Sequence, residues 1–489
     1  MSASVAVDLE PVIGLEIHVQ LRTRRKMFCG CPNLYGAPPN TLVCPVCLGL
    51  PGALPVPNGQ AVTLAVRAAL GLDCQVHLRS VFARKNYFYP DLPKGYQITQ
   101  YDCPLATDGV LDLWPPPERW PARVRIRRLH LEEDAGKSLH DRVPGATAVD
   151  LNRAGVPLIE IVTEPDLVAP EHARLFLTRL KQTLEFLGVS DCDMEKGSLR
   201  VDANVSLRPQ GATTLGVKTE LKNLNSFGFL EKALHAEIAR QKAALAAGQP
   251  VVHETLLWDA ARQQVRPMRS KEESHDYRYF PEPDLPPLLL EPAWIAEQRA
   301  TLPERPAARW RRFQEQYGLP PQHADVLTLD RATADYFEAV VTAGAPPAEA
   351  ASWIMGEVLA WTREHALDVG SFPMPATQLA ELAALVRQGV LSRALARQVF
   401  ERALREGRSP RSIVEAEGLA QVQEEGALAA WVHEVLAAHP QEVARYRAGE
   451  TKLLGWFVGQ VMRRSQGKAD PKRTQTLLRQ ALEAAGSTS

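Results

Sequence analysis

A proline-rich segment constrains the fold most, because it separates two parts of the chain with different sequence patterns. Seven prolines lie between residues 280 and 307, and proline both removes a backbone donor and restricts the residue before it. Before this segment apolar residues alternate as in strands, whereas after it they recur at helical spacing. A second break lies at Gly407-Arg-Ser-Pro410. We therefore expect an α+β chain with an antiparallel-sheet domain at 1–293, an all-α domain at 294–410 and a small helical tail domain at 411–489.

The composition is that of a folded globular protein. The 489 residues include 45% hydrophobic residues, and 56 Lys+Arg balance 57 Asp+Glu, which excludes a disordered or collagen-like chain. The net charge of −1 gives no overall sign of a nucleic-acid partner, but a local basic patch stays open. No run approaches the roughly 20 apolar residues of a membrane span, and residues 1–10 resemble no secretion signal. We expect a cytoplasmic protein without membrane association.

Three segments, residues 12–21, 198–208 and 217–222, alternate apolar and polar residues as strands with one buried face do. Two further segments, 130–134 and 157–162, place acids at the ends of apolar runs. The polar residues of interest on these segments are Glu16, His18, Glu133, Glu160, Arg200, Asp202, Lys218, Glu220 and Lys222.

Two interpretations of these polar faces remain open. The simpler one is an antiparallel sheet with one solvated face. The other is a metal site, because carboxylates and one imidazole recur between apolar residues, and oxygen ligands from several strands suit Mg²⁺ or Mn²⁺ that also carries phosphates. Neighbouring arginines and lysines would then neutralise the phosphates.

Four of the seven cysteines form two close pairs, Cys29-Gly-Cys31 and Cys44-Pro-Val-Cys47, separated by twelve residues. Four thiolates at this spacing can close a tetrahedral zinc site, and a full shell of sulfurs makes that site structural. The odd cysteine number and the crowding suit a reduced cytosolic protein better than a disulfide framework. The alternative is four reduced thiols without a metal.

Eight motifs follow one another over the first 285 residues. They are Val12-Ile-Gly-Leu-Glu-Ile-His18, Lys85-Asn-Tyr-Phe-Tyr-Pro-Asp91, His130-Leu-Glu-Glu-Asp-Ala-Gly-Lys-Ser138, Asp150-Leu-Asn-Arg153, Pro157-Leu-Ile-Glu-Ile-Val162, Gly197-Ser-Leu-Arg200, Glu220-Leu-Lys-Asn-Leu-Asn-Ser226 and Asp276-Tyr-Arg-Tyr-Phe-Pro-Glu-Pro283. Together they resemble the B-subunit family of the aspartyl/glutamyl-tRNA amidotransferases. The resemblance is weaker in the helical part and returns at residues 455–462 and 470–471.

The resemblance implies a two-step reaction on a cradle-shaped sheet domain of the glutamine-synthetase type. ATP phosphorylates the side-chain carboxylate of aspartate or glutamate carried by tRNA(Asn) or tRNA(Gln), and ammonia then displaces the phosphate to give the amide. The chemistry is consistent with the residues, because phosphoryl transfer depends mainly on positioning and on charge neutralisation by a divalent cation.

The resemblance also implies the site residues. Glu16, His18, Glu133 and Glu160 are expected to be catalytic and to form the Mg²⁺ shell, with Asp202 as a transient ligand. We add the cations Arg200, Lys218, Lys222, Arg269 and Arg278 as candidates for contacts to phosphates or to the acceptor end. Some members of the family carry the four-cysteine zinc site and others do not.

The expected partners follow from what the sequence does not contain. It shows no amidase or glutaminase signature, so the resemblance implies that a separate amidase, the A subunit, supplies ammonia from glutamine, and that a small protein, the C subunit, completes a heterotrimer. The cognate aminoacyl-tRNA synthetase is a further expected partner. Residues 450–489 carry seven basic and three acidic residues, a net charge of +4, which is consistent with tRNA backbone contacts by the tail.

Two other functions remain open: a free-standing ATP-dependent amide ligase acting on a small acid, and a non-catalytic tRNA-binding scaffold. A free-standing ligase would not need a long helical arm, and a non-catalytic scaffold would not need acidic residues on convergent strands. The sequence leaves open whether Asp-tRNA(Asn), Glu-tRNA(Gln) or both are substrates. Its length leaves no room for the synthetase-like insertion of the related archaeal E-type protein.

Overall fold

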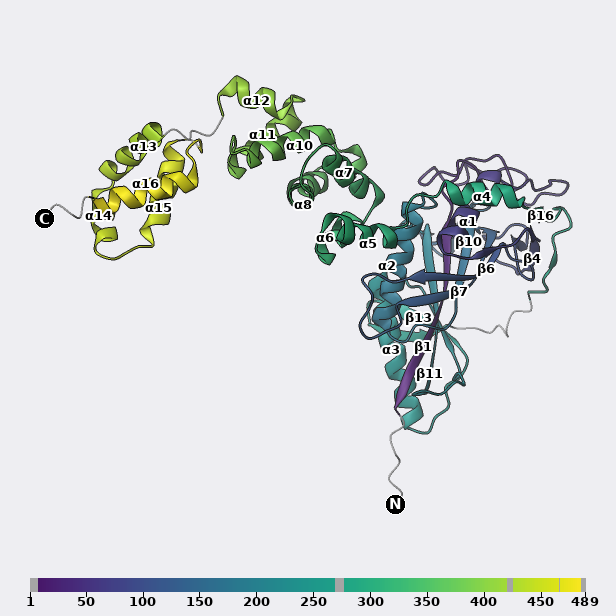
Figure 1. The fold of residues 1–489 in the computed structure, drawn as a ribbon. Coiled ribbons are helices and arrows are strands. Elements are labelled where there is room, and N and C mark those ends of the chain that lie inside the picture. Colours follow the sequence, from purple (N-terminus) through teal and green to yellow (C-terminus); the bar gives the residue numbers. More distant parts are fainter. Residues whose placement is uncertain (1–7, 269–276, 420–424, 466, 485–489) are drawn as a thin grey trace, which may run out of the picture. The chain divides into compact units, whose positions relative to one another are not determined.

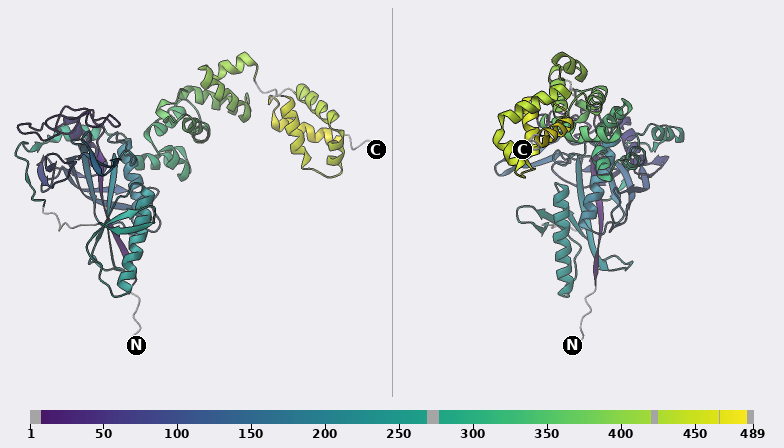
Figure 2. Two further views of the ribbon diagram at one scale, coloured as in Figure 1. Left: turned by 180° about the vertical axis from the view of Figure 1, so that it is seen from behind. Right: turned by 60° about the vertical axis from the view of Figure 1, so that its left-hand side comes forward.

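The computed structural model describes residues 8–268, 277–419, 425–465 and 467–484. The chain divides into two compact units, 1–310 and 311–489. The first contains the strands and the second is helical in its described residues (Figures 1 and 2), so the expected α+β class is confirmed. Helix α4 (Pro292–Ala300), which follows the proline-rich segment, belongs to the first unit.

A nine-stranded sheet forms the centre of the first unit. Every neighbouring pair is antiparallel except β12 and β13, which run parallel. In spatial order the strands are β14 (Gln264–Pro267), β13 (Thr255–Asp259), β12 (Thr219–Lys222), β11 (Leu199–Pro209), β1 (Leu9–Gln20), β10 (Pro157–Thr163), β7 (Arg123–Glu133), β6 (Ala106–Asp112) and β2 (Gln75–Val76).

Alternation along the central strands gives the sheet one apolar and one polar face. In β1, Leu15 and Ile17 are almost fully buried, while Glu16 and His18 point to the opposite face. Helices α2 (Pro170–Phe186) and α3 (Phe227–Ala246) lie side by side along the sheet (Figure 1). Burial of the apolar face thus leaves the polar face available for a site.

Helix α3 begins where its sequence provides an N-cap. The hydroxyl of Ser226 accepts a hydrogen bond from the backbone N–H of Phe229, which satisfies one of the free donors of the first turn. Inside the helix, the buried carboxylate of Glu237 accepts hydrogen bonds from Thr219 of β12 and from Gln241. These contacts fix the helix against the strand that carries Lys222.

The remaining elements of the first unit are short and lie around the sheet. They are α1 (Gly59–Gly71), β3 (Arg79–Ser80), β4 (Ala83–Asn86), β5 (Tyr96–Thr99), β8 (Lys137–Val143), β9 (Ala146–Asp150), β15 (Phe280–Pro281) and β16 (Leu288–Leu289). The pairing β15–β4–β5 brings the beginning of the proline-rich segment beside residues 83–99.

The second unit is built from short helices. Leu428, Phe457 and Leu478 are completely buried and belong to a core shared by residues 428–482, within the predicted tail domain. None of the described helices has the length and apolar character needed to cross a bilayer. The helices are α5 (Pro306–Tyr317), which spans the division, α6 (Pro321–Leu327), α7 (Arg331–Thr342), α8 (Pro347–Trp353), the π-helical η1 (Ile354–Val358), α9 (Leu359–Glu364), the 3₁₀ turn η2 (Val369–Ser371), α10 (Ala376–Arg387), α11 (Arg393–Glu406), α12 (Pro410–Glu417), α13 (Glu425–Ala438), α14 (Pro440–Arg447), α15 (Leu453–Arg464) and α16 (Pro471–Ala484).

Candidate active site and cysteine centre

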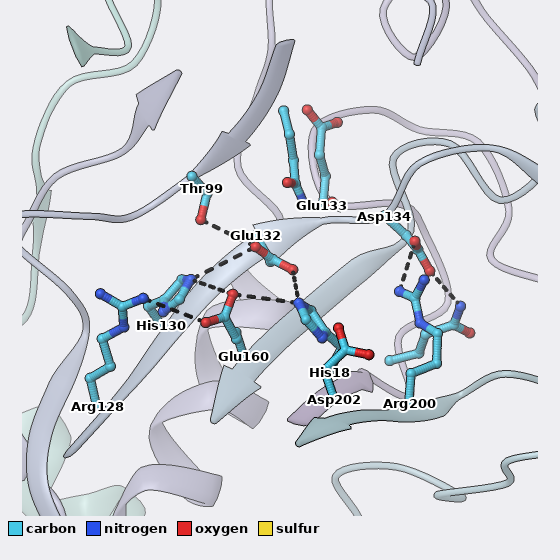
Figure 3. Close-up of polar contacts among 12 residues, drawn as sticks. His18, Thr99, Arg128, His130, Glu132, Glu133, Asp134, Glu160, Arg200 and Asp202 are labelled. Carbon is cyan, nitrogen blue, oxygen red and sulfur yellow. Dashed lines mark hydrogen bonds and ion pairs between the residues drawn. The ribbon is translucent and has the colours of Figure 1, made fainter. Parts of the chain in front are cut away.

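Three side chains from neighbouring strands meet on the polar face of the sheet (Figure 3). His18 lies on β1, Glu160 on β10 and Glu132 on β7. Nε2 of His18 is 3.4 Å from Oε1 of Glu132 and 3.4 Å from Oε2 of Glu160, and the three ligand atoms lie within 4.8 Å of one another. His18 and Glu160 are paired directly across β1 and β10, so their side chains share one face.

One oxygen of Glu132 accepts no hydrogen bond from the described residues. Oε2 accepts from the hydroxyl of Thr99 at 3.2 Å, whereas in the described part of the chain the buried Oε1 accepts no hydrogen bond and has only the 3.4 Å contact to Nε2 of His18. A buried carboxylate oxygen without a donor is costly, and a bound cation would remove that cost. Two carboxylates and one imidazole form a ligand set that accepts Mg²⁺ or Mn²⁺. The residues present therefore fit a divalent cation.

The acids in and beside this cluster differ in the direction in which their pKa values are shifted. Burial alone would raise the pKa of Glu132, but a hydrogen bond from His130 and the charge of His18 outweigh burial and lower that pKa. Burial also opposes ionisation of Glu160, whose pKa is nevertheless lowered by the charge of His130 and a hydrogen bond from His18. Glu16 behaves in the opposite way, because burial and the charge of Glu160 raise its pKa. The cluster thus contains two readily ionised acids.

The structure does not bring Glu133 to this cluster, although the sequence analysis expected it there. Glu133 points away (Figure 3) and is almost fully buried. Its Oε1 accepts a hydrogen bond from the backbone N–H of Ile98 at 3.0 Å and pairs with Lys94. Its neighbour Glu132 occupies the position that was expected for Glu133.

Strand periodicity explains this exchange. Along β7 the buried apolar residues lie at even positions up to Ile126 and at odd positions from Leu129 onward. The pairing between β10 and β7 shifts before Thr163, as at a β-bulge, and such a shift moves the following side chains to the other face. After the shift, Glu132 faces the polar side and Glu133 the opposite side. The change of phase is visible in the sequence and was the signal that could have identified Glu132.

The other expected acids lie close to the cluster. Glu16 and Asp202 are paired across β1 and β11, and both line a cavity of about 320 Å³ together with His18 and Glu160. Lys222 enters the same cavity, with its Nζ 2.8 Å from Oδ2 of Asp202. Five residues expected from the sequence are therefore brought together.

The remaining expected cations lie elsewhere. Nη2 of Arg200 pairs with Oδ1 of buried Asp134 at 2.9 Å, and Arg200 lines a second cavity. Lys218 lines a different hollow. Arg278 has an exposed side chain and does not line the cavity of the cluster. Arg269 lies outside the described residues.

Several residues that line the cluster cavity were missed by the sequence analysis: Lys85, Tyr101, His130, Tyr277 and Tyr279. The rings of Tyr101 and Tyr279 stack with centroids 4.0 Å apart, and Nζ of Lys85 lies 4.7 Å from the ring centroid of Tyr277. Tyr277 and Tyr279 stand two positions apart in an extended motif, and His130 alternates with Glu132 in β7. This alternation is the sequence signal from which His130, Tyr277 and Tyr279 could have been predicted.

A second cavity of about 540 Å³ adjoins the first, and Asp202 lines both. Its wall combines cations, such as Arg153 and Arg200, with an exposed aromatic residue, Tyr35, and apolar side chains. The cavity also presents several amide side chains, namely Gln20, Asn33, Asn152, Asn223 and Asn225.

The four paired cysteines converge into one centre. Their sulfurs lie within 4.8 Å of one another, and Sγ of Cys44 is 3.9 Å from Sγ of Cys47. Tetrahedral zinc–thiolate bonds place sulfurs about 3.8 Å apart. A hydrogen bond from Cys29 and the positive charge of Lys26 lower the pKa of Cys47 to about 5, against the effect of burial. The centre therefore fits zinc in both spacing and ligand chemistry.

Comparisons with known proteins identify the family of the chain. A family model described as "GatB/GatE catalytic domain" matches residues 11–296, and one described as "GatB domain" matches residues 335–482. Three curated relatives are named as B subunits of aspartyl/glutamyl-tRNA(Asn/Gln) amidotransferase. The one from Thermosynechococcus vestitus is 51% identical over 98% of this chain and 97% of its own length. The relative from Thermodesulfovibrio yellowstonii is 48% identical over 96% of this chain and 99% of its own length, and that from Carboxydothermus hydrogenoformans is 49% identical over 97% and 99%. The chain therefore belongs to the family of B subunits of the tRNA-dependent aspartyl/glutamyl amidotransferases.

Proposed function

We propose that this chain activates the side-chain carboxylate of aspartate or glutamate on misacylated tRNA(Asn) or tRNA(Gln) by ATP-dependent phosphorylation, and that the acyl phosphate then reacts with ammonia to give the amide. The observation that carries the proposal is the cluster of His18 with the buried Glu132 and Glu160, in which one carboxylate oxygen accepts no hydrogen bond from any described residue. Family membership supports the reaction.

In this proposal Glu132, Glu160 and His18 hold Mg²⁺ or Mn²⁺, with Glu16 and Asp202 close by. A cation there would neutralise charge on the phosphates during transfer. Lys222 and Arg128 balance the acids around the cavity, through contacts to Asp202 and Glu160. The tyrosine pair of residues 101 and 279 reduces the access of water, which would hydrolyse an acyl phosphate.

We further propose that the second cavity receives the nucleoside part of ATP. Amide groups can donate to and accept from a base, an aromatic ring such as Tyr35 can stack on it, and Arg153 and Arg200 can neutralise phosphates. Because Asp202 lines both cavities, a nucleotide that extends from one to the other would bring its phosphates to the cluster.

The cysteine centre is proposed to hold structural zinc. Four thiolates complete the coordination shell, so no position stays open for substrate. Zinc would instead pin residues 29–47, a segment without helix or strand beyond one isolated bridge residue.

The partners are proposals from the family and the sequence. An amidase, the A subunit, would supply ammonia from glutamine, a small protein, the C subunit, would complete a heterotrimer, and the cognate synthetase would hand over the misacylated tRNA. The sheet domain would be the cradle-shaped domain of the glutamine-synthetase type. The enzyme would be cytoplasmic. The tail, with its own core and net positive charge, would contact the tRNA backbone.

A single-turnover assay on the reconstituted complex tests the proposal. Misacylated Glu-tRNA(Gln), ATP and ammonium are mixed with wild type, with Glu160→Gln, and with Glu171→Gln as a control at an exposed position on α2. We expect tRNA-dependent ATP cleavage in wild type and control, and a loss of at least about 100-fold in Glu160→Gln.

Each alternative function predicts a different result in this assay. Equal ATP cleavage with free glutamate would indicate a free-standing ligase. Amidation that survives in Glu160→Gln at the wild-type rate would indicate a non-catalytic scaffold.

A further inference from the structure

Lys26 is completely buried beside the cysteine centre. Its Nζ donates to the backbone carbonyl of Leu42 at 2.7 Å and lies 3.5 Å from that of Leu151. The same nitrogen is 3.8 Å from Sγ of Cys47. The side chain thus contacts both the cysteine-bearing segment and the segment that precedes β10.

A buried ammonium needs a counter-charge, because removing it from water without one costs several kcal/mol. Among the described residues, no carboxylate forms an ion pair with Lys26. The nearest group that can carry negative charge is the thiol of Cys47. The position of Lys26 is therefore explained if Cys47 is a thiolate, as a zinc ligand must be.

The charge balance of the centre supports this pairing. Four thiolates around Zn²⁺ carry a net charge of −2, and such a centre in a protein interior is stabilised by nearby cations and N–H donors. Lys26 reduces the net charge to −1. Arg25, the preceding residue, is exposed and donates to the carbonyl of Gly30 at 2.5 Å, so that solvent screens its charge.

We propose that Lys26 is the charge-compensating residue of the cysteine centre and sets its affinity for zinc. The inference rests on the proposed zinc site and is independent of the ATP-dependent reaction. Through Leu42 and Leu151, Lys26 also ties the metal-bound segment to residues 151–156, which lead into the strand of Glu160.

The test measures zinc affinity of the full-length chain by competition with a chromogenic chelator. The variants are Lys26→Met, which removes charge and donor, Lys26→Gln, which keeps a donor without charge, and Lys26→Arg, which keeps the charge. Arg24→Gln is the matched control, because it removes an exposed charge from the same segment. Melting temperatures of zinc-loaded and zinc-stripped protein are measured in parallel.

We expect Lys26→Met and Lys26→Gln to weaken zinc binding by about 10- to 100-fold, Lys26→Arg to restore most of it, and Arg24→Gln to stay within about threefold of wild type. The increase in melting temperature on zinc binding should shrink in Lys26→Gln. Unchanged affinity in Lys26→Gln, or an equal fall in melting temperature with and without zinc, would overturn the proposal by showing a purely structural role. Wild-type protein that binds no zinc would overturn the zinc centre itself, and the ATP-cleavage assay would still stand.

Discussion

The segment that carries Tyr277 and Tyr279 contacts β4 through backbone pairing, hydrogen bonds from Asn86 and ion pairs of Arg84. The ion pair between Arg84 and Glu282 gives a quantitative prediction. Nε and Nη2 of Arg84 lie 2.7 and 2.9 Å from the two carboxylate oxygens of Glu282. The Glu282 side chain is 0% exposed and that of Arg84 is 19% exposed. The pair joins β4 to the residues that follow β15.

The cost of Glu282→Gln follows from these contacts. Two hydrogen bonds between charged partners, worth about 1.5–3 kcal/mol each, are replaced by one bond from the guanidinium to an uncharged amide oxygen, worth about 1.5 kcal/mol. Arg84 keeps a contact to Asp284 at 3.1 Å and a position over the ring of Tyr96, which limits the loss. We therefore expect local stability to fall by about 2–3 kcal/mol.

Hydrogen exchange followed by mass spectrometry measures this local effect. Exchange in residues 277–289 should be about 30- to 150-fold faster in Glu282→Gln, with little change in the central strands. Asp284→Asn is the control, because Asp284 is partly exposed and makes a single contact to Arg84; its effect should stay below about 1 kcal/mol. Unchanged exchange in Glu282→Gln, or equal acceleration in the two variants, would refute the role of the pair.

Three further predictions concern helix α3, the cysteine centre and a surface ion pair. Ser226→Ala should lower the free energy of unfolding by about 1 kcal/mol in urea titrations, whereas Ser226→Asn should be nearly neutral, because asparagine also caps helices. If the cysteine centre holds zinc as proposed, removal of the metal by a chelator should lower the melting temperature and expose residues 29–47 to proteases, and unchanged proteolysis would contradict the structural role. Although burial would raise the pKa of Asp166, hydrogen bonds from Arg125 lower it. The stabilisation that the ionised Asp166 carboxylate provides is thus present above the unfolded pKa of about 3.9 and is lost as pH falls through the folded pKa. Asp166→Asn should therefore lower the free energy of unfolding by about 1 kcal/mol at pH 7, since Arg125 is largely exposed. In denaturation curves measured over a pH series, the variant should not differ from wild type at the acid end.

Secondary structure could be predicted wherever the pattern of apolar and polar residues within one strand or helix is enough to identify it. Alternation in residues 12–21 and 198–208 identified β1 and β11, the shared face of Glu16 and His18 on β1, and the polar side of β11 that carries Asp202. The order of the strands could not be predicted, because β1 pairs with β10 and β11, which lie far away in the sequence. Such long-range pairing depends on the packing of the whole sheet.

The candidate site shows the same limit at the level of single residues. A motif that contains two adjacent glutamates does not by itself say which one faces the cavity; the change of phase along the whole of β7, at the bulge, selects Glu132. The exposure of Arg278 depends on the backbone of its segment, where φ is +42°, and sequence spacing does not reveal that conformation. Lys26 gave no sequence signal, because its surroundings combine the cysteine-bearing segment with Leu151, which lies more than 100 residues away.

The most direct test of the central claim compares the two adjacent glutamates of β7. Single-turnover, tRNA-dependent ATP cleavage is measured for Glu132→Gln and Glu133→Gln in the reconstituted complex, after circular dichroism has confirmed that both variants fold. If the cluster of His18, Glu132 and Glu160 performs the ATP-dependent step, cleavage falls by at least about 100-fold in Glu132→Gln and stays within about tenfold of wild type in Glu133→Gln, which alters a site on the other face. Loss of cleavage in Glu133→Gln together with a wild-type rate in Glu132→Gln would contradict the account.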